Sequence, residues 1–413
     1  MKDRSVLIVG LNYAPEPVGI GPYTQGLAEA LAARGAKVRV VCGQPYYPQW
    51  RIYAAHAGSG WTAHDENGVK VTRCPHYVPA QPSGLKRIVH LASFALSALL
   101  PALVSVLRTR RDKPDLVIAI APALPSVFTA WLAARLSGAM LWIHVQDFEV
   151  EAALATGLLG KGNPLARAAA WVERRLLALG DVVSTISPQM CRRLVDKGIA
   201  QDRVLEMRNW SDDRFVPDPG GAAAIRAEWN LGGRIVALYS GNIARKQGIE
   251  ILIEAARLLK ERPDIAFVIC GEGPNRAELE RLAAGLPNVQ LHDLQPAERM
   301  GAMLTMADLH LLPQIAGAAD LVLPSKLTNM LASGRPVIAT SEPGTGLHAE
   351  VEGCGLVTPP GDASALAGAI AQLADNPERR AQLGQAAARR AAERWRKDAI
   401  IDRALAFVTT MTG

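Results

Sequence analysis

Short apolar runs alternate with segments of helical periodicity along almost the whole chain. The runs are continuous in polarity rather than alternating, which is typical of strands buried on both faces of a parallel sheet. In the first half, six strands are predicted: Ser5–Val9, Lys37–Cys42, Val69–Arg73, Leu116–Ile120, Met140–Val145 and Val182–Thr185. Helical patterns follow most of them, beginning with Pro22–Ala33, where proline suits the first helical position. This alternation predicts parallel βαβ units.

The same alternation restarts after a junction at residues 204–221, which holds a last short strand and then a loop-like segment with two Pro and two Gly. Strands are predicted beyond it at Ile235–Ser240, Ala266–Cys270, Val289–His292, Leu309–Leu312 and Val337–Ala339. The predicted helices are Gly248–Lys260, Arg276–Ala284, Glu298–Met306 and Ser364–Leu373, followed by Pro377–Trp395 and Asp398–Met411. The second half is therefore a further α/β domain and not a sequence repeat of the first.

Two domains are also what the length indicates, since 413 residues exceed one simple core. The expected fold class is α/β, with two Rossmann-like, doubly wound parallel-sheet domains. We place the first domain at residues 1–215 and the second at 216–384. The C-terminal helices, residues 385–413, are expected to pack back on the first domain.

Charge changes this picture locally. The chain has a formal net charge of +6, and residues 70–113 alone carry eight Lys or Arg against one acid, Asp112. This excess indicates a local anionic partner. Five scattered Cys without a CxxC pair fit a reducing cytoplasm. No cluster has the spacing of a metal site, the N-terminus lacks a signal-peptide pattern, and neither metal nor cofactor is predicted.

One apolar segment stands apart. Ile88–Leu107 contains no charged residue, and Lys86, Arg87, Arg108, Arg110 and Arg111 flank it. Twenty helical residues are long enough to cross a bilayer core of about 30 Å. A membrane span, a plain core helix and a helix lying on a membrane are the three alternatives. We favour the third, with Leu85–Arg111 on the inner face of the cell membrane and the protein in the cytoplasm.

In the first domain, two features follow predicted strands. The loop Gly10–Gly21 joins a strand to a helix without a GxGxxG fingerprint. It either presents Gly19 and Gly21 to an acceptor or forms an ordinary flexible turn. His144, Gln146 and Asp147 end another strand, where ligands bind in such sheets. A structural role is the alternative for a lone His at a strand end.

The richest stretch is Asp320–Thr340. Ser325 is a good N-cap, Leu327, Met330 and Leu331 fall on one apolar helix face, and Gly334 suits the left-handed residue that ends a helix. Ser325 and Lys326 would bind an anion at the helix start. Asn329, one turn further, would bind a hydroxyl-rich group. The alternative is an ordinary capped helix with a surface Lys.

Three more loops follow strands of the same predicted sheet. Gly241 and Asn242 precede the cations Arg245 and Lys246. Gly271, Glu272 and Gly273 would let backbone approach a ligand closely, and Leu294 would offer an apolar ledge to a base. Together with the stretch above, they predict cations for a diphosphate, a surface for a base and a group for a ribose.

These motifs resemble the retaining glycosyltransferases of GT-B fold family 4, nearly end to end. The likeness covers the opening strand and glycine loop, Ile186–Pro188, Asn209–Pro217, Gly241–Gly248, Gly271–Pro274 and Pro324–Pro336. Within the family it is greatest to the colanic acid branch regarded as fucosyltransferases, in Trp142–Ala152 and Leu323–Leu331. Two departures are evident. Asn329 and Leu321 replace the family's Glu-x7-Glu pair, and the cations of its Gly-Arg…Lys-Gly loop have moved to Arg245 and Lys246.

The resemblance implies two domains facing across a cleft, a nucleotide-sugar bound by the second and an acceptor presented by the first. It implies GDP-fucose or a similar GDP-sugar as donor, a lipid-linked glycan as acceptor, and exopolysaccharide or lipopolysaccharide assembly as context. Arg245, Lys246, Lys326 and Asp147 are the expected catalytic residues. The alternatives are a UDP-sugar transferase, a sugar-nucleotide epimerase of the same fold, and a basic membrane-surface protein without activity. Nucleic acid is not an expected partner, since no aromatic-interleaved basic patch is present.

Overall fold

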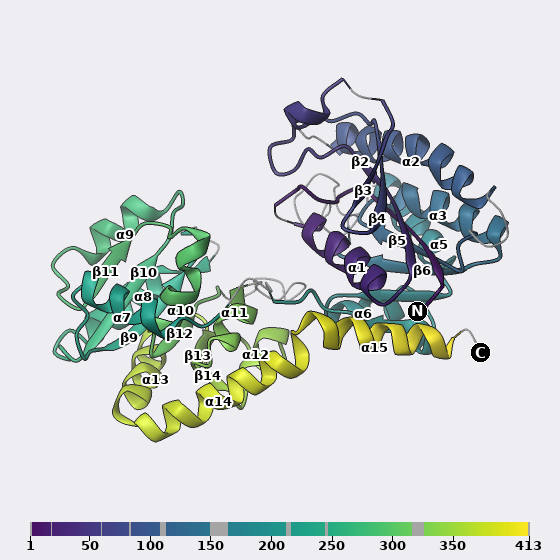
Figure 1. The fold of residues 1–413 in the computed structure, drawn as a ribbon. Coiled ribbons are helices and arrows are strands. Elements are labelled where there is room, and N and C mark those ends of the chain that lie inside the picture. Colours follow the sequence, from purple (N-terminus) through teal and green to yellow (C-terminus); the bar gives the residue numbers. More distant parts are fainter. Residues whose placement is uncertain are drawn as a thin grey trace. The chain divides into compact units, whose positions relative to one another are not determined.

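The computed structural model describes residues 2–17, 19–58, 60–81, 84–107, 113–148, 164–211, 216–243, 247–315 and 326–411. The chain divides into two compact units, each with its own sheet and helices (Figure 1). Unit 1 comprises Met1–Asn209 and Ile401–Gly413, and unit 2 comprises Trp210–Ile400. These divisions fall after residues 209 and 400, whereas the sequence analysis placed them after 215 and 384.

Unit 1 is built on an eight-stranded sheet in the order β3-β4-β2-β1-β5-β6-β7-β8. Its strands are β1 Ser5–Gly10, β2 Lys37–Gly43, β3 Thr62–Glu66, β4 Val69–Cys74, β5 Leu116–Ala121, β6 Met140–Val145, β7 Val182–Thr185 and β8 Val204–Glu206. All neighbours pair in parallel except β3 and β4. Strand β3 was not predicted, because its Thr-Ala-His-Asp-Glu sequence is polar and largely exposed.

Helices cover the sheet of unit 1. They are α1 Gly21–Ala33, α2 Gly84–Val106, α3 Leu124–Ser137, α5 Pro164–Leu177, α6 Pro188–Asp196 and α15 Lys397–Thr410, with single turns η1 Ala54–His56 and η2 Gln201–Arg203. Helices α2, α3, α5 and α6 contribute Phe94, Val127, Leu177 and Met190 to one core cluster with the strands. Helix α3 packs against both α2 and α5.

Unit 2 is built on a six-stranded, fully parallel sheet in the order β11-β10-β9-β12-β13-β14. Its strands are β9 Ile235–Ser240, β10 Ile265–Cys270, β11 Val289–His292, β12 Leu309–Leu312, β13 Val337–Thr340 and β14 Gly355–Thr358. Its helices are α7 Pro219–Glu228, α8 Glu250–Leu258, α9 Arg276–Ala283, α10 Met300–Met306 after the turn η4 Ala297–Arg299, α11 Lys326–Ala332, α12 Gly346–Val351, α13 Ala363–Asp375 and α14 Pro377–Arg394.

Two core clusters show that unit 2 is doubly wound. Phe267 of β10 packs in a cluster with residues of α8 and α13. Its neighbour Val268 packs in another cluster, with residues of α7 and α10. Because successive strand residues face opposite sides of a sheet, helices cover both faces. The predicted fold class, two Rossmann-like parallel-sheet domains, is confirmed.

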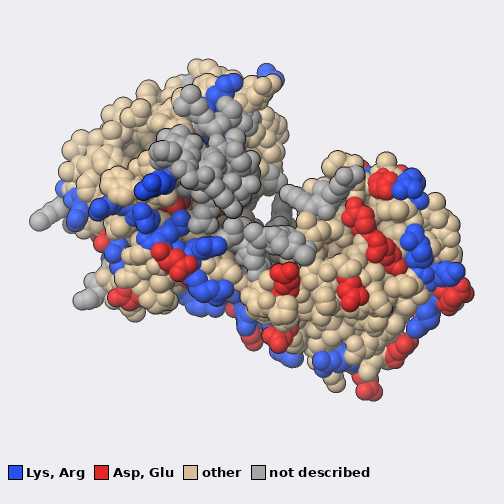
Figure 2. All heavy atoms as spheres, turned by 180° about the vertical axis from the view of Figure 1, so that it is seen from behind, with Lys and Arg blue, Asp and Glu red and all other residues tan. Residues whose placement is uncertain are grey.

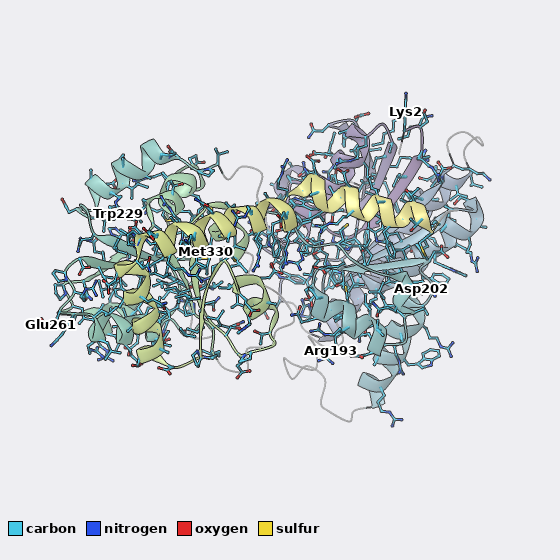
Figure 3. The ribbon with its side chains drawn as sticks, turned by 90° about the horizontal axis from the view of Figure 1, so that it is seen from below. Lys2, Arg193, Asp202, Trp229, Glu261 and Met330 are labelled. Atoms are coloured by element: carbon cyan, nitrogen blue, oxygen red, sulfur yellow. The ribbon has the colours of Figure 1, made fainter. Side chains whose placement is uncertain are left out.

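The helix predicted within Asp320–Thr340 is α11. Leu327, Met330 and Leu331 are fully buried in a cluster with residues of α14, as the apolar spacing predicted. Figure 3 shows Met330 close to α14. Gly334 takes the left-handed φ of +70° just beyond the helix. Helix α14 therefore packs within unit 2. Of the two C-terminal helices, only the part of α15 from Ile401 onward belongs to unit 1, where Arg34 pairs with Asp402 at 2.8 Å.

Candidate functional site

Among the described residues of unit 2, several buried polar side-chain atoms lack a hydrogen-bond partner, and we single out three of them: Gln247 Oε1, Lys326 Nζ and Asn329 Oδ1. Leaving such a group unsatisfied costs about 1–3 kcal/mol, and more for a charge. All three belong to loops or helix turns that follow β9 or β12, neighbouring strands of the parallel sheet. Ligands bind at this edge in doubly wound sheets. Lys326 Nζ is a cation that would suit an anionic group, whereas the two amide oxygens would accept hydrogen bonds from hydroxyl groups.

Lys326 is the centre of this site. Its Nζ lies 4.1 Å from the centroid of the Tyr239 ring and beside Gly241, where an added Cβ would be only 3.4 Å away. Burial lowers the pKa of Lys326 to about 8. A nearby anion would raise that pKa again, since opposite charge favours the ammonium form. An anionic ligand would therefore stabilise the charged form of this amine.

Asn329 lies one helical turn after Lys326. Its Nδ2 has only a weak contact of 3.9 Å to the sulfur of Met300, and its Oδ1 is buried without a hydrogen-bond partner. An amide can both donate to and accept from sugar hydroxyls. Asn329 thus keeps its hydrogen-bonding capacity available for a ligand, which is compatible with the predicted ribose contact.

The loops after β9, β10 and β11 are tied side by side. The backbone N–H of Gly241 donates to Cys270 at 3.0 Å, that of Ile243 to Glu272 at 2.8 Å, and that of Gly271 to His292 at 3.1 Å. Arg276 reinforces them by donating from Nη1 to the carbonyls of Gly271 and His292. The sequence analysis did not single out Arg276, whose signal was its position directly after a glycine-proline loop.

This arrangement explains Gly271 and Gly273 differently from the expectation. A Cβ on Gly271 would come within 1.9 Å of the carbonyl oxygen of Gly241, and one on Gly273 within 2.2 Å of that of Ile243. Glycine is therefore required at both positions because the backbone of the neighbouring loop, and not a ligand, approaches closely there. The two glycines shape the site by letting its loops meet.

The remaining donor-side residues are placed as follows. The carbonyl of Asn242 accepts from the Tyr239 hydroxyl at 2.8 Å, so this loop also holds the aromatic ring under Lys326. Glu272 and Leu294 are exposed. Arg245, Lys246 and Ser325 lie outside the described residues. Helix α11 has only seven residues, so its dipole makes only a small contribution to anion binding.

In unit 1, His144 and Gln146 belong to a closed hydrogen-bond network. His144 Nδ1 lies 2.8 Å from Ser184 Oγ, and Gln146 Nε2 donates to His144 Nε2 at 2.9 Å. Gln146 and Asn209 exchange two further bonds of 2.9 Å. His144 is 1% exposed, and burial lowers its pKa to about 3. This geometry supports the structural alternative stated for His144, and Gln146 belongs to the same network. Asp147, by contrast, is exposed beyond the end of β6.

We expect Ser184→Ala to lower the free energy of unfolding by about 2–3 kcal/mol, because it leaves two buried donors unpaired. Those donors are His144 Nδ1 and Trp142 Nε1, which lies 2.7 Å from the same oxygen. Denaturant unfolding measures the change. Ser137→Ala is the control, since Ser137 only bonds back to its own helix and should stay within about 0.5 kcal/mol of the wild type. Equal effects of the two substitutions would contradict the network.

The glycine loop of unit 1, Gly10–Gly21, is likewise held in place by contacts with neighbouring residues. Gly19 has φ +74° and faces the Tyr47 ring, while a Cβ on Gly21 would meet Glu16 Cβ at 3.0 Å. Buried Glu16 accepts from the backbone N–H of Tyr46 and of Tyr47 at 3.0 Å each, and burial raises its pKa. These contacts favour a turn of fixed conformation over a flexible one.

Arg73 corrects the charge argument made from the sequence. Its side chain is buried, forms an ion pair with Glu66 and donates from Nη2 to the Ala14 carbonyl at 2.7 Å. It therefore anchors the glycine loop instead of facing an anionic partner. Arg108, Arg110 and Arg111 lie outside the described residues. Lys86 and Arg87 at the start of α2 are exposed, so part of the basic rim remains available.

An aromatic cluster that the sequence analysis missed lies beside this loop. The Tyr46 ring contacts Trp50, His76 and His90, and the His76 ring contacts Phe94. His90 Nδ1 is hydrogen-bonded to the Tyr77 carbonyl, which fixes the first half of α2 to the segment after β4. Burial lowers the pKa of His76 to about 4. The sequence did not indicate this cluster, because its residues come from three separate segments: the loop of Tyr46 and Trp50, the segment of His76 after β4, and α2 with His90 and Phe94.

Comparison with known proteins fits both units. Residues 18–210 match the glycosyl transferase 4-like domain, and residues 222–390 match glycosyl transferases group 1. The chain is 45% identical, over 82% of its length and 83% of the relative's, to an Escherichia coli K12 protein described as a colanic acid biosynthesis glycosyl transferase, WcaI. It is also 32% identical, over 44% of its length and 50% of the relative's, to a GDP-mannose-dependent mannosyltransferase of Mycolicibacterium smegmatis.

Solved structures share the fold. Anabaena HepE in complex with UDP superposes with a TM-score of 0.67 at 15% identity, over 99% of this chain and 100% of that one. The catalytic domain of starch synthase IV from Arabidopsis thaliana gives 0.67 at 14% identity, over 99% of each chain. Two Rossmann-like, parallel-sheet units together with these structural neighbours define the GT-B fold. The chain belongs to the GT-B glycosyltransferase family that joins a 4-like domain to a group 1 domain.

Proposed function

We propose that this enzyme transfers a sugar from a nucleotide-sugar to a lipid-linked glycan during exopolysaccharide assembly, with retention of the anomeric configuration. The observation that carries the proposal is the pair of buried, unpartnered groups Lys326 Nζ and Asn329 Oδ1 at the ligand edge of unit 2. The glycan context is supported by the relative described for colanic acid biosynthesis.

Lys326 would act on the leaving group. As the bond between the anomeric carbon and the phosphate oxygen breaks, negative charge develops on the nucleoside diphosphate. A fixed cation in a water-poor site stabilises that charge. The acceptor hydroxyl oxygen bonds to the same carbon from the same face, and its proton passes to an oxygen of the departing phosphate. This route needs neither a metal nor paired carboxylates.

The other donor-side residues are proposed in supporting roles. Asn329 would bind the ribose, Ser325 the diphosphate, and Leu294 the face of the base. Arg245 and Lys246, close in sequence to Gly241 and Asn242, would add charge at the diphosphate. On the acceptor side, the exposed Asp147 remains a candidate catalytic carboxylate.

For the donor we propose GDP-fucose or a similar GDP-sugar. The resemblance to the colanic acid branch supports this choice, and so does the relative named as GDP-mannose-dependent. A UDP-sugar is the alternative, because structures with the same fold contain UDP and UDP-glucose. Discrimination of one methyl or hydroxyl on the sugar is worth only about 1–3 kcal/mol, so the base has to be determined first.

Thermal unfolding in the presence of GDP-, UDP-, dTDP- and CMP-sugars, without metal and then with Mg²⁺, tests the donor. A ligand at 100 times its Kd that binds only the folded state adds about 2.7 kcal/mol of stability. The proposal predicts a rise in Tm with a GDP-sugar and the same rise with Mg²⁺. A rise in Tm with UDP-sugars alone would show that the donor is a UDP-sugar, the alternative named above. No rise with any of them would contradict the proposed site.

We further propose that the enzyme lies in the cytoplasm on the inner face of the cell membrane, held by Leu85–Arg111. Within the described residues, one helix, Lys86–Val106, is long and apolar enough to cross a membrane. Only 33% of its most apolar 18-residue stretch is buried in the protein. Its outer side forms a continuous apolar stripe, between 46% and 83% exposed: Val89, Leu96, Leu100, Val104 and Leu107. Their spacing of seven, four, four and three residues is one helix face. This supports a helix that packs on the protein with one side and on lipid with the other.

Leu100→Glu is expected to weaken binding to phosphatidylglycerol-containing vesicles by at least about tenfold, since a carboxylate in the apolar face opposes insertion. Co-sedimentation at low salt measures the change. Leu258→Glu in unit 2 is a matched control, because Leu258 and Leu100 are both 59% exposed. Vesicle binding that is unaltered by Leu100→Glu, or equally reduced by both substitutions, would refute the membrane contact of α2.

A further inference from the structure

Helix α5 carries a second exposed surface that the function described so far does not use. Arg167, Trp171 and Arg174 follow one another at spacings of four and three residues, hence on one face. Trp171 is 53% exposed, Val172 beside it is exposed too, and the Arg175 guanidinium lies 5.3 Å from the Trp171 ring centroid. About half of the Trp171 side chain is therefore exposed, and three Arg side chains flank it on α5.

A hollow of about 670 Å³ adjoins this face. Arg167, Trp171 and Arg174 line it from α5, and Asp196 and Lys197 line it from the end of α6. Lys197 is ion-paired with buried Glu173 and sits over the Phe148 ring at 4.9 Å, so its charge is neutralised within the fold. Among the described lining residues, two arginines against the single carboxylate of Asp196 leave a positive balance, which suits an anionic headgroup.

Helix α5 is close to the apolar stripe of α2. Helix α3 lies between them and packs against both, and all three cover the same face of the sheet (Figure 1). The outer side of α3 exposes Phe128 and Leu136. Figure 2 shows an uncharged surface where α2 and α3 lie, with Lys and Arg side chains gathered below it, where α5 and α6 lie. Arg193, which Figure 3 labels on α6, is exposed.

Aromatic and aliphatic side chains rimmed by Arg are the composition of a membrane interface. Trp places its amphipathic ring at headgroup level, and each Lys or Arg near an anionic surface adds roughly 1 kcal/mol. We propose that α5 is a second membrane contact, in which Trp171 and Val172 enter the headgroup region and Arg167, Arg174 and Arg175 bind the phosphates of anionic phospholipids. This goes beyond the contact of α2 and is independent of the donor.

A second contact changes what the membrane does to the enzyme. One helix on a bilayer leaves the protein free to roll about that helix axis. Two contacts separated by α3 hold the layer of α2, α3 and α5 parallel to the bilayer and so fix the orientation of unit 1. The carboxyl ends of its strands, where an acceptor would bind, are then held at a constant height above the lipid.

Quenching of Trp fluorescence by brominated phospholipids tests the contact directly. Vesicles of brominated phosphatidylcholine and phosphatidylglycerol are added to the whole protein and to Trp171→Phe, which keeps an aromatic side chain. The proposal predicts that the wild type loses more fluorescence than Trp171→Phe. Equal quenching of the two proteins, with both bound to the vesicles, would overturn it.

Charge reversal supplies the second measurement. Arg174→Glu with Arg175→Glu is expected to weaken partition to the same vesicles by about 25-fold or more, since each lost cation is worth roughly fivefold. The matched control is Arg379→Glu with Arg389→Glu, an equal change of charge at exposed positions of α14 in unit 2. Equal loss in both pairs would mean that net charge alone matters, and would also overturn the proposal.

The outcomes separate this contact from the proposed activity. The α5 variants should show the same Tm rise with donor as the wild type in the absence of lipid. If α5 substitutions leave vesicle binding unchanged while Leu100→Glu abolishes it, the membrane contact is confined to α2. If the donor panel gives no Tm rise but Trp171 is quenched, the membrane contact stands and the proposed donor site does not.

Discussion

Lys326→Met is expected to lower turnover by about two to three orders of magnitude while the protein stays folded. Losing one preorganised group that stabilises transition-state charge typically costs about 10²–10³ in rate. Methionine keeps the apolar stem of the side chain over the Tyr239 ring, where Nζ now lies at 4.1 Å, and removes only the charge. Single-turnover transfer with saturating donor measures the loss. Lys260→Met, at an exposed position of unit 2, should leave turnover unchanged.

The pH dependence gives this substitution a signature that a merely structural role would lack. The pKa of Lys326 is about 8 in the free fold against 10.5 as its ordinary value. Between those values the unfolded chain binds more protons, so the wild type gains stability as pH rises from 8 to 10.5. A bound diphosphate favours the ammonium, so nucleotide affinity should fall as pH rises above 8, by at most about tenfold per unit.

Both trends should disappear in Lys326→Met, because it has no group to titrate there. At pH 7 the variant should be at least as stable as the wild type, since it no longer buries an unpaired charge. Thermal unfolding and nucleotide titration at pH 7 and pH 9.5 follow both quantities. A wild-type affinity that does not vary over this range would show that Lys326 does not meet the diphosphate, whatever its effect on rate.

The largest effect on stability is expected from Gly271→Ala. The new Cβ would lie 1.9 Å from the Gly241 carbonyl oxygen, a backbone atom that cannot yield without moving its loop. Overpacking of this kind costs about 3 kcal/mol, which lowers the Tm of a unit this size by about 6–12 °C. Donor binding should weaken as well, because the displaced loop includes Gly241, which adjoins Lys326 Nζ.

Gly368→Ala is the matched control within the same unit. Gly368 lies exposed inside α13, and a Cβ there would meet nothing within 4 Å. Alanine should raise the stability by about 0.5–1 kcal/mol, since glycine is a poor helix former. If Gly271→Ala unfolded at the wild-type temperature and kept its donor affinity, the interlocked loops would not be what shapes the site.

The fold was largely predictable from the chain because its strands are buried on both faces. Continuous apolar runs such as Ile265–Cys270 mark such strands clearly, and the alternation with helices then dictates parallel pairing. The edge strand Thr62–Glu66 was not predicted, because a strand is recognised from the sequence by apolar residues along at least one of its faces, and this strand has no such face. Gly334 and the face of Leu327, Met330 and Leu331 were predicted because helix-end chemistry is local in sequence.

The site was predictable only in its position. Strand ends could be located from the sequence, so Lys326 and Asn329 were identified. Whether a polar group has a hydrogen-bond partner depends on residues far away in the chain, and these pairings cannot be read from the sequence. His144 is paired with Ser184 across 40 residues, and Gln146 with Asn209 across 63. Arg73 looked like a surface cation until its partner Glu66 and its burial were known.

The most direct test of the account is a calorimetric titration of GDP and UDP, in metal-free buffer at pH 7, into the wild type and Lys326→Met. We expect one site for at least one of these nucleotides on the wild type. The variant should bind the same nucleotide about 30-fold to several thousandfold more weakly, because an uncompensated diphosphate costs about 2–5 kcal/mol. Equal affinity of the two proteins for both nucleotides, or no binding by the wild type, would contradict the claim that Lys326 holds the leaving diphosphate.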